Sequence, residues 1–280
     1  MTSSDWAQWI GRTETVEDVV ALSPAAAAAA TFDDTDTPFA AGSPLPPLWH
    51  WFYFLPKAPR SKIGDDGHPQ RGGFLPPIPL PRRMFAGARL SFPAPLLIGR
   101  PARREGVIAS VSEKSGRTGT LAFVTVRYLI SQDGRVCVEE EQDIVYREPG
   151  AAVPAPVPAP WPPAPPGAWT REITPDPVLL FRFSALTFNG HRIHYDRPYA
   201  SDVEGYPGLV VHGPLTAVLL MELVRRKADR PVARFSFRGL APLFDLAPFR
   251  LVGVANDAVV VLEALGPDGR QAMEATAELA

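Results

Sequence analysis

Two histidines three positions apart, His191 and His194, are the residues with the clearest potential for acid/base chemistry. A neutral imidazole exchanges protons near pH 7, so it can activate water or deliver a proton to carbon. Asn189 and Asp196 flank the pair and are candidates to orient water or to share the acid/base work. Metal binding is the weaker interpretation, because no Cys or Glu lies nearby at a convincing ligand spacing. We therefore expect a catalytic site here, with no metal and no cofactor.

A predicted helix begins shortly after the histidines, at His212, Gly213 and Pro214. Proline is favoured in the first turn of a helix, and Gly213 suits the N-cap before it. Backbone N–H groups at a helix N-terminus lack intrahelical partners and favour negative charge. Gly213 is therefore the candidate oxyanion-hole donor, and His212 is expected to position it beside the substrate.

Four arginines are candidates for binding a negatively charged substrate. Arg192 and Arg197 flank His194, while Arg82 and Arg83 lie in the first half of the chain. A guanidinium can hold a carboxylate through two parallel hydrogen bonds. Each arginine can equally contact a phosphate of coenzyme A or lie on the surface, and the sequence leaves this open.

The elements that must position these residues divide the chain into two halves. We expect an N-terminal half over 1–148, a connector over 149–167 and a C-terminal half over 168–280. The connector is dense in proline, which cannot donate ladder hydrogen bonds and favours extended geometry. It is expected to be a semi-rigid link.

In the N-terminal half, alternating apolar and β-branched residues predict three strands, over 106–111, 118–130 and 135–146. The polyalanine tract at 25–30 predicts a helix, although such a tract can also be flexible. Its small side chains are expected to leave room for an acyl chain. His50 and His68 lie in segments rich in proline and are expected to be loop histidines.

In the C-terminal half we expect a strand at 178–186, then the histidine-containing turn, then a helix from Pro214 that is apolar nearly all round. Four further strands are predicted, over 232–237, 248–255, 258–265 and 271–279. A helix with so much apolar surface must be buried, and the strands can bury it only by wrapping around it. We therefore expect an α+β fold of two antiparallel sheets, each wrapped around a central helix.

Composition excludes several other classes of protein. Apolar residues make up 46% and charged residues 21%, which are ordinary globular values, and a net charge of -2 gives no basic field for nucleic acid. The lone Cys137 cannot form an intrachain disulfide and fits a reducing compartment. No apolar run approaches the length needed to span a membrane. We expect a cytoplasmic protein that binds neither nucleic acid nor membrane.

The segment 181–223 resembles the MaoC-like hydratases, specifically the double-hot-dog branch with mesaconyl-C4-CoA and itaconyl-CoA hydratases and mitochondrial-type 3-hydroxyacyl-thioester dehydratases. The resemblance rests on FSALTFNGHRIHYDRPYA at 183–200 and GYPGLVVHGPL at 205–215, supported by PLWHWFYF at 47–54 and RGGFLP at 71–76. In the family motif Asp-x-Asn-Pro-x-His, His194 takes the place of the histidine. If the run Asn189-Gly190-His191-Arg192 contains two extra residues relative to the motif, Thr187 stands where the aspartate would be. Either His191 replaces that aspartate, or Asp196 assists from the other side.

The resemblance implies a hydro-lyase that adds water reversibly to a short branched or dicarboxylic enoyl-CoA of the mesaconyl-CoA or itaconyl-CoA type. It also implies a catalytic C-terminal half and an acyl pocket in the N-terminal half. Alternatives are a 3-hydroxyacyl-thioester dehydratase of fatty acid metabolism and, given the missing aspartate, an inactive acyl-CoA-binding protein. A thioesterase is weaker, because Glu222 lies two turns into the helix. The acyl chain, the direction of reaction and the oligomeric state stay open, a homodimer being one option.

Overall fold

The computed structural model describes residues 6–116 and 119–280. Within this part of the chain, ten strands form one antiparallel sheet in the order β1-β3-β4-β5-β2-β7-β10-β9-β8-β6. The first half supplies β1 (Thr13–Val19), β2 (Arg82–Ser91), β3 (Pro101–Gly116), β4 (Gly119–Gln132) and β5 (Arg135–Arg147). The second half supplies β6 (Trp169–Ile173), β7 (Val232–Gly239), β8 (Phe249–Asn256), β9 (Val259–Leu265) and β10 (Gln271–Leu279).

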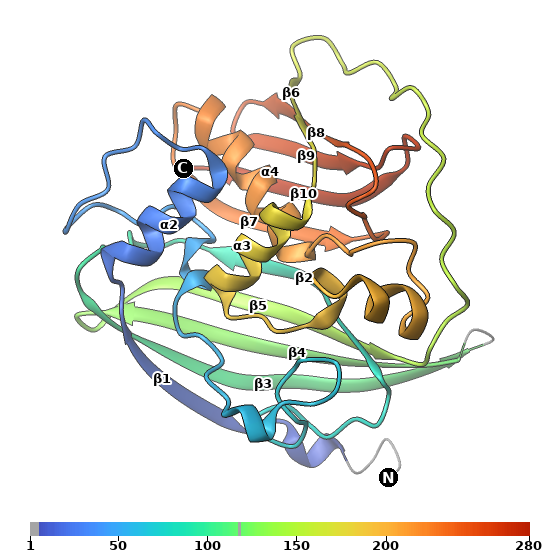
Figure 1. Ribbon diagram of the computed structural model, residues 1–280. Coiled ribbons are helices and arrows are strands. Elements are labelled where there is room, and N and C mark those ends of the chain that lie inside the picture. The colour runs from blue at the N-terminus through green and yellow to red at the C-terminus, as the bar shows by residue number, and fades with distance from the viewer. Residues whose placement is uncertain (1–5, 117–118) are drawn as a thin grey trace.

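Within residues 6–116 and 119–280, three α-helices lie on one side of this sheet (Figure 1). They are α2 (Leu22–Phe32), α3 (Pro177–Thr187) and α4 (Gly213–Lys227). The short helical turns are η1 (Ala7–Trp9), η2 (Trp49–Phe52), η3 (Arg60–Lys62), η4 (Arg192–His194) and the π-helical turn η5 (Tyr199–Val203). The helix α4 contacts β2 and the strands of the second half, whereas α2 packs mainly against α3 and η2.

The two halves meet where β2 pairs with β7, from Gly87 opposite Arg238 to Ser91 opposite Arg234. A side chain on Gly87 would bring its Cβ to 2.4 Å from the carbonyl oxygen of Phe237, so only glycine allows this close approach. The expected antiparallel architecture with few helices is confirmed. The strands of the two halves nevertheless form one continuous sheet, where we expected two.

The largest error in the sequence prediction is the segment 178–186, which is the helix α3 and not a strand. Asp176 caps this helix, because its carboxylate accepts a hydrogen bond of 2.8 Å from the backbone N–H of Leu179, and Pro177 follows in the first turn. One face is buried through Leu180 and Phe183. A short apolar run does not distinguish a strand from a helix, and the capping signal decides it.

The other predicted helices and strands are present. The polyalanine helix is α2, the helix after Pro214 is α4, and all seven strands predicted outside 178–186 are found, although Thr118 lies outside the described residues. Asp133 and Gly134 both have positive φ in the β4–β5 turn, as a tight hairpin requires. The N-cap of α4 is His212, one residue before the one we expected. The strands β1, β2 and β6 were not predicted.

The connector contains no helix or strand and runs along the side of the molecule from β5 to β6 (Figure 1). Three of its donors bond to the second half. The N–H of Val153 donates to Gly205 at 2.9 Å, that of Ala159 to Pro267 at 2.8 Å, and the Trp161 indole to Gly266 at 2.7 Å. Such anchors hold a segment that has no ladder bonds of its own.

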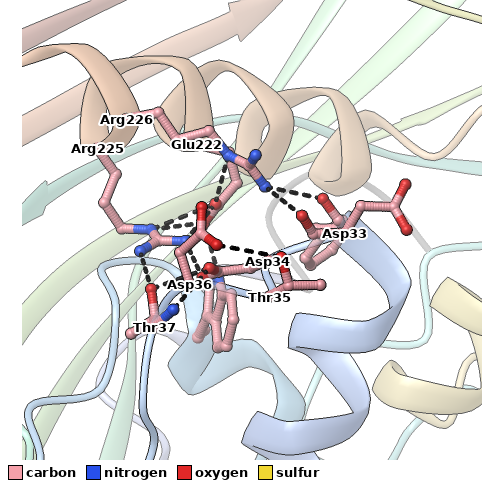
Figure 2. Close-up of polar contacts among 10 residues, drawn as sticks. Asp33, Asp34, Thr35, Asp36, Thr37, Glu222, Arg225 and Arg226 are labelled. Carbon is pink, nitrogen blue, oxygen red and sulfur yellow. Dashed lines mark hydrogen bonds and ion pairs between the residues drawn. The ribbon is translucent and has the colours of Figure 1, made fainter.

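A buried charged network links α4 to the first half, and Figure 2 shows its arginines and carboxylates close together. Glu222 is fully buried and accepts hydrogen bonds from the Trp49 indole at 3.0 Å and from Arg225 at 2.7 Å. Arg225 also pairs with Asp34, just after α2. Burying charges is costly unless each is paired, so this network depends on every partner being present.

We expect Glu222→Gln to lower the free energy of unfolding by about 3–5 kcal/mol, because it removes the buried negative charge that faces Arg225. Urea denaturation measures this. Glu278→Gln, which breaks an exposed pair with Arg234, is the matched control and should cost less than about 1 kcal/mol. Equal losses in the two variants would contradict this account of the network.

Candidate active site

A large cavity of about 1300 Å³ lies between the two halves. The first half lines it with the segment 54–76 and with β2 and neighbouring strands. The second half contributes α3, the turn at 188–195 and the start of α4. A cavity of this size exceeds the roughly 300–1,000 Å³ of usual small-ligand pockets, so it suits a long ligand.

Four of the five histidines of the chain form a row along this cavity. The ring centroids of His68 and His191 are 4.1 Å apart, those of His191 and His194 are 5.3 Å apart, and His194 stacks on His212 at 3.6 Å. The sequence analysis predicted three of these residues at one site. The structure brings them together and adds His68.

His194, in η4, has a defined tautomer. Its Nδ1 lies 2.7 Å from the carbonyl oxygen of Val210, and because a carbonyl only accepts, Nδ1 must carry the proton. In the neutral ring Nε2 is therefore an unprotonated base. Burial lowers the pKa of His194 to about 4, so the ring is neutral at pH 7.

The ring of His212 packs against the ring of His194. It is fully buried, its Nε2 lies 2.9 Å from the hydroxyl of Ser184 on α3, and its ring packs on Phe183. Burial holds the pKa of His212 well below its usual range. The ring of His212 thus packs between Phe183 and His194. The expected role of His212 in positioning Gly213 stays a prediction.

The ring of His191 contacts that of His194, and Asn189 holds the backbone of His191. The side-chain oxygen of Asn189 accepts a hydrogen bond of 3.0 Å from the N–H of His191. Burial, with nearby His68 and His194, lowers the pKa of His191 to about 2. His191 is therefore also neutral, and Asn189 acts on it through the backbone.

Gly213 lines the cavity as the first residue of α4. Helix geometry leaves the first N–H groups without intrahelical acceptors, and Pro214 has none to offer. The N–H of Gly213 and the positive end of the helix dipole are therefore available to a developing enolate oxygen. The oxyanion-hole role of Gly213 stays a prediction.

The loop 64–70 also lies at the candidate site, which was not predicted from the sequence. Asp66 accepts a hydrogen bond of 3.0 Å from Nδ1 of His68, and the backbone oxygen of Asp66 accepts from the N–H of Arg192 at 2.9 Å. Gly67 has φ of +88°, and a Cβ there would lie 1.8 Å from the carbonyl oxygen of Gly190. The turn-forming run GDDGH at 64–68 is visible in the sequence, but nothing in it indicates docking on a turn in the other half.

Asp66, His68 and His191 are the described residues best placed to hold a metal ion, since their ligand atoms lie within 4.8 Å of one another. Two histidines and a carboxylate are a known zinc ligand set. Asp66 and His68 already satisfy each other by a hydrogen bond. We therefore interpret the group as a hydrogen-bonded pair facing His191.

Four predicted site residues do not line the main cavity. Asp196 and Arg192 pair with each other at 2.8 Å. Arg197 pairs with Asp245, and Arg82 with Glu204. Each guanidinium pairs with a carboxylate outside the main cavity, although Nη1 of the buried Arg82 has no hydrogen-bond partner. None of the four residues is part of the proposed site.

Arg83 is the predicted arginine that does line the cavity. It hydrogen-bonds the phenol of Tyr146, and its charge contributes to the lowered pKa values of His68 and His191. Within residues 6–116 and 119–280 it has no ion pair with an acid, unlike Arg82, Arg192 and Arg197. An unpaired guanidinium beside the histidines is suited to a substrate carboxylate.

The polyalanine helix does not shape the cavity as we expected. Its alanines at 25, 28 and 29 are buried in the core, Ala27 is exposed, and none of them lines the cavity. The first half contributes larger side chains there, among them Trp51, Phe74, Phe85 and Tyr146.

None of the described helices is long and apolar enough to cross a membrane.

Comparison with known proteins identifies the family of this chain. The family model for hydroxyacyl-thioester dehydratase type 2 matches residues 48–245, which include the histidine row and Gly213. The chain belongs to this family. A mesaconyl-C(4)-CoA hydratase from Chloroflexus aurantiacus is 66% identical over 279 residues, which cover all of this chain and 99% of that protein.

Solved structures agree on the fold of this family member. A MaoC-like dehydratase from Phytophthora capsici superposes with a TM-score of 0.68 at 15% identity, covering 100% of this chain and 99% of the other. A Mycobacterium tuberculosis protein described as a double hotdog fold gives a TM-score of 0.60 at 14% identity, covering 100% and 98%. These structures share the fold of this chain, and the family model and the 66% identical relative confirm the family resemblance.

If His194 is the general base, as the sequence predicts, His194→Ala should reduce turnover of a thioester substrate by about 10²–10⁴. His191→Ala should lose less. Steady-state kinetics measures both, with circular dichroism to confirm that each variant is folded. Near-normal turnover in folded His194→Ala would exclude it as the base.

The pH dependence of kcat/KM should reflect the lowered pKa of His194. A general base acts in its neutral form, so if His194 is the base, activity should persist as the pH falls through 6.5 and decline only near pH 4, the pKa to which burial lowers it. A pH-rate profile over the range in which the protein stays folded tests this. An acidic limb centred near 6.5 would show that His194 titrates as an exposed histidine does.

Proposed function

We propose that this protein is a hydro-lyase that adds water reversibly to mesaconyl-C4-CoA or a closely related dicarboxylic enoyl-CoA. The observation that carries the proposal is the 66% identity, over the full length of both chains, to the mesaconyl-C(4)-CoA hydratase of Chloroflexus aurantiacus. The neutral, buried His194 with a free Nε2 supports the chemistry that this name describes.

In the proposed reaction, Nε2 of His194 takes a proton from water as the water oxygen attacks the β-carbon of the enoyl thioester. Negative charge then develops on the thioester oxygen, where the N–H of Gly213 stabilises it. Protonation of the α-carbon completes the addition. His191 and Asn189 help to order the reacting groups, and the reverse sequence removes water.

Arg83 is the proposed contact for the free carboxylate of the substrate. Its support is its place in the cavity, its proximity to His68 and His191, and its lack of an acidic partner among the described residues. Two parallel N–H···O bonds would fix the carboxylate and thereby orient the double bond against His194.

A 3-hydroxyacyl-thioester dehydratase is the second candidate, favoured by the description of the family model. A thioesterase has less support. The one carboxylate of α4, Glu222, is engaged by Trp49 and Arg225 and lies outside the cavity. A panel of mesaconyl, itaconyl and crotonyl thioesters and 3-hydroxyacyl-CoA, with thiol release measured in parallel, distinguishes these activities from acyl-CoA binding alone.

The proposal extends to the setting of the enzyme. We place the base in the half 168–280 and the acyl pocket mainly in the half 1–148, joined by the connector 149–167. A cytoplasmic location fits the coenzyme A substrate and the single, buried Cys137. A homodimer is the proposed assembly, and light scattering on the purified protein tests it.

We expect Arg83→Gln to lower kcat/KM for mesaconyl-C4-CoA by roughly 10- to 100-fold, because a hydrogen bond to a charged group contributes about 1.5–3 kcal/mol. Crotonyl-CoA, which has no free carboxylate, should not lose activity. Arg89→Gln, in an exposed ion pair on the same strand, is the control. An equal loss with both substrates would argue against carboxylate binding by Arg83.

A further inference from the structure

Hydration transfers two protons, and His194 accounts for one of them. A second group must deliver a proton to the α-carbon, or remove it in the reverse direction. His212 is fully buried with its Nε2 directed to Ser184. Among the described acids, Glu14 alone lines the main cavity, and it pairs with Arg104. The histidine row therefore has to supply this group.

We infer that His68, held by Asp66, is the second acid/base group of the active site, so that the N-terminal half supplies part of the catalytic machinery. The inference rests on the proposed hydratase function. It assigns a catalytic role to His68 and a positioning role to Asp66, in the half where we expected only an acyl pocket.

The hydrogen bond from His68 to Asp66 fixes the orientation of the imidazole. Because an ionised carboxylate only accepts, Nδ1 of His68 carries the proton at 3.0 Å, and Nε2 is the nitrogen left for chemistry. His68 lines the same cavity as His194 and Gly213. Its ring lies 4.1 Å from that of His191, at the opposite end of the row from His212.

The loop that carries this pair is built against the catalytic turn. The N–H of Arg192 donates to Asp66 at 2.9 Å, and its guanidinium donates to the backbone oxygen of Asp65 at 3.0 Å. Gly67 and Gly190 face each other so closely that a Cβ on either would meet the backbone of the other within 3 Å. Two glycines at one contact let the loop and the turn approach, and this sets the position of His68.

The charges around His68 also fit the role. Asp66, Arg71, Arg83 and His191 face it, and Asp66 is the negative group among them. His68 and nearby groups hold the pKa of Asp66 low, so its carboxylate stays ionised. Burial keeps the resting His68 neutral by lowering its pKa. When His68 accepts a proton, the carboxylate of Asp66 stabilises the imidazolium.

Each proton has a defined path in this scheme. In dehydration, Nε2 of neutral His68 takes the α-proton, and the electron pair is delocalised onto the thioester oxygen, which the N–H of Gly213 stabilises. The proton then passes from His68 through His191, whose ring lies between them, to the unprotonated Nε2 of His194. His194 delivers it to the hydroxyl as the C–O bond breaks and the electron pair forms the double bond, so water leaves and the rings are neutral again. Hydration is the exact reverse.

The test uses His68→Gln and Asp66→Asn in the full chain, with Asp65→Asn on the same loop as the control. We expect His68→Gln to lower kcat by about 10²–10⁴, as loss of a general acid/base does. Asp66→Asn keeps an oxygen that can accept from Nδ1 but removes the charge, so it should lose activity while KM changes little. Asp65→Asn should retain activity, because the guanidinium of Arg192 bonds only to its backbone oxygen.

The decisive measurement is the deuterium isotope effect on dehydration of the hydrated product labelled at the α-carbon. It should rise in His68→Gln and Asp66→Asn, because C–H cleavage becomes slower, and should not rise in His194→Gln. Activity retained in His68→Gln, or an isotope effect unchanged in both loop variants, would overturn the inference. Loss of wild-type activity on chelation, with recovery on adding Zn²⁺, would also overturn the inference, because it would indicate that Asp66, His68 and His191 hold a metal ion. A wild-type protein inactive on every enoyl-CoA would instead reject the proposed function.

Discussion

The pairing of β2 with β7 is the constraint on which the rest of the structure depends. It joins the strands of both halves into one sheet, and Gly87 makes the approach of the two backbones possible. The same strand carries Arg83 and Phe85 into the cavity, while α4 packs over the joined strands with its N-terminus at the cavity wall. The candidate active site therefore lies at the junction of the two halves, and residues of both halves line its cavity.

Burial then determines the protonation of the site. Removing an imidazole from water disfavours its charged form, and His191, His194 and His212 all have lowered pKa values for this reason first. Neutral rings can stack closely without repulsion, as His194 and His212 do at 3.6 Å. The carbonyl of Val210 selects the tautomer of His194. Burial and this carbonyl together leave Nε2 of His194 unprotonated and fix the orientation of the ring, without a carboxylate bonded to Nδ1.

Much of this fold was predictable because its long elements carry strong local patterns. The alternation in β3 to β5 and the apolar surface of α4 come from residues close in sequence. The helix α3 was missed because its apolar run is short and the capping contact of Asp176 outweighed strand-like composition. The strand β2 begins after a series of prolines and gains its partners β5 and β7 from segments far away in the chain. Pairing of that kind leaves little trace in the strand itself.

The candidate site likewise contains residues that were predictable from local sequence and one that was not. His191, His194 and Gly213 lie within 23 residues of one another and carry a local pattern that the sequence analysis used. His68 is more than a hundred residues away, and only the docking of its loop on the turn at Gly190 brings it to the cavity. The arginines show the converse. Arg192 and Arg197 lie within three residues of His194 in the sequence, yet carboxylates outside the cavity engage both.

Arg83 and His68 connect substrate selection to proton transfer under the proposed function. The positive charge of Arg83 contributes to the lowered pKa of His68 in the empty cavity. A carboxylate bound to Arg83 would offset that charge, and exclusion of water by the substrate would strengthen the attraction between the His68 imidazolium and Asp66. Protonation of His68 would then become easier when a dicarboxylic thioester is bound. A thioester without a free carboxylate, such as crotonyl-CoA, would leave the charge of Arg83 in place. The enzyme would then discriminate between the two substrates in the proton transfer as well as in binding.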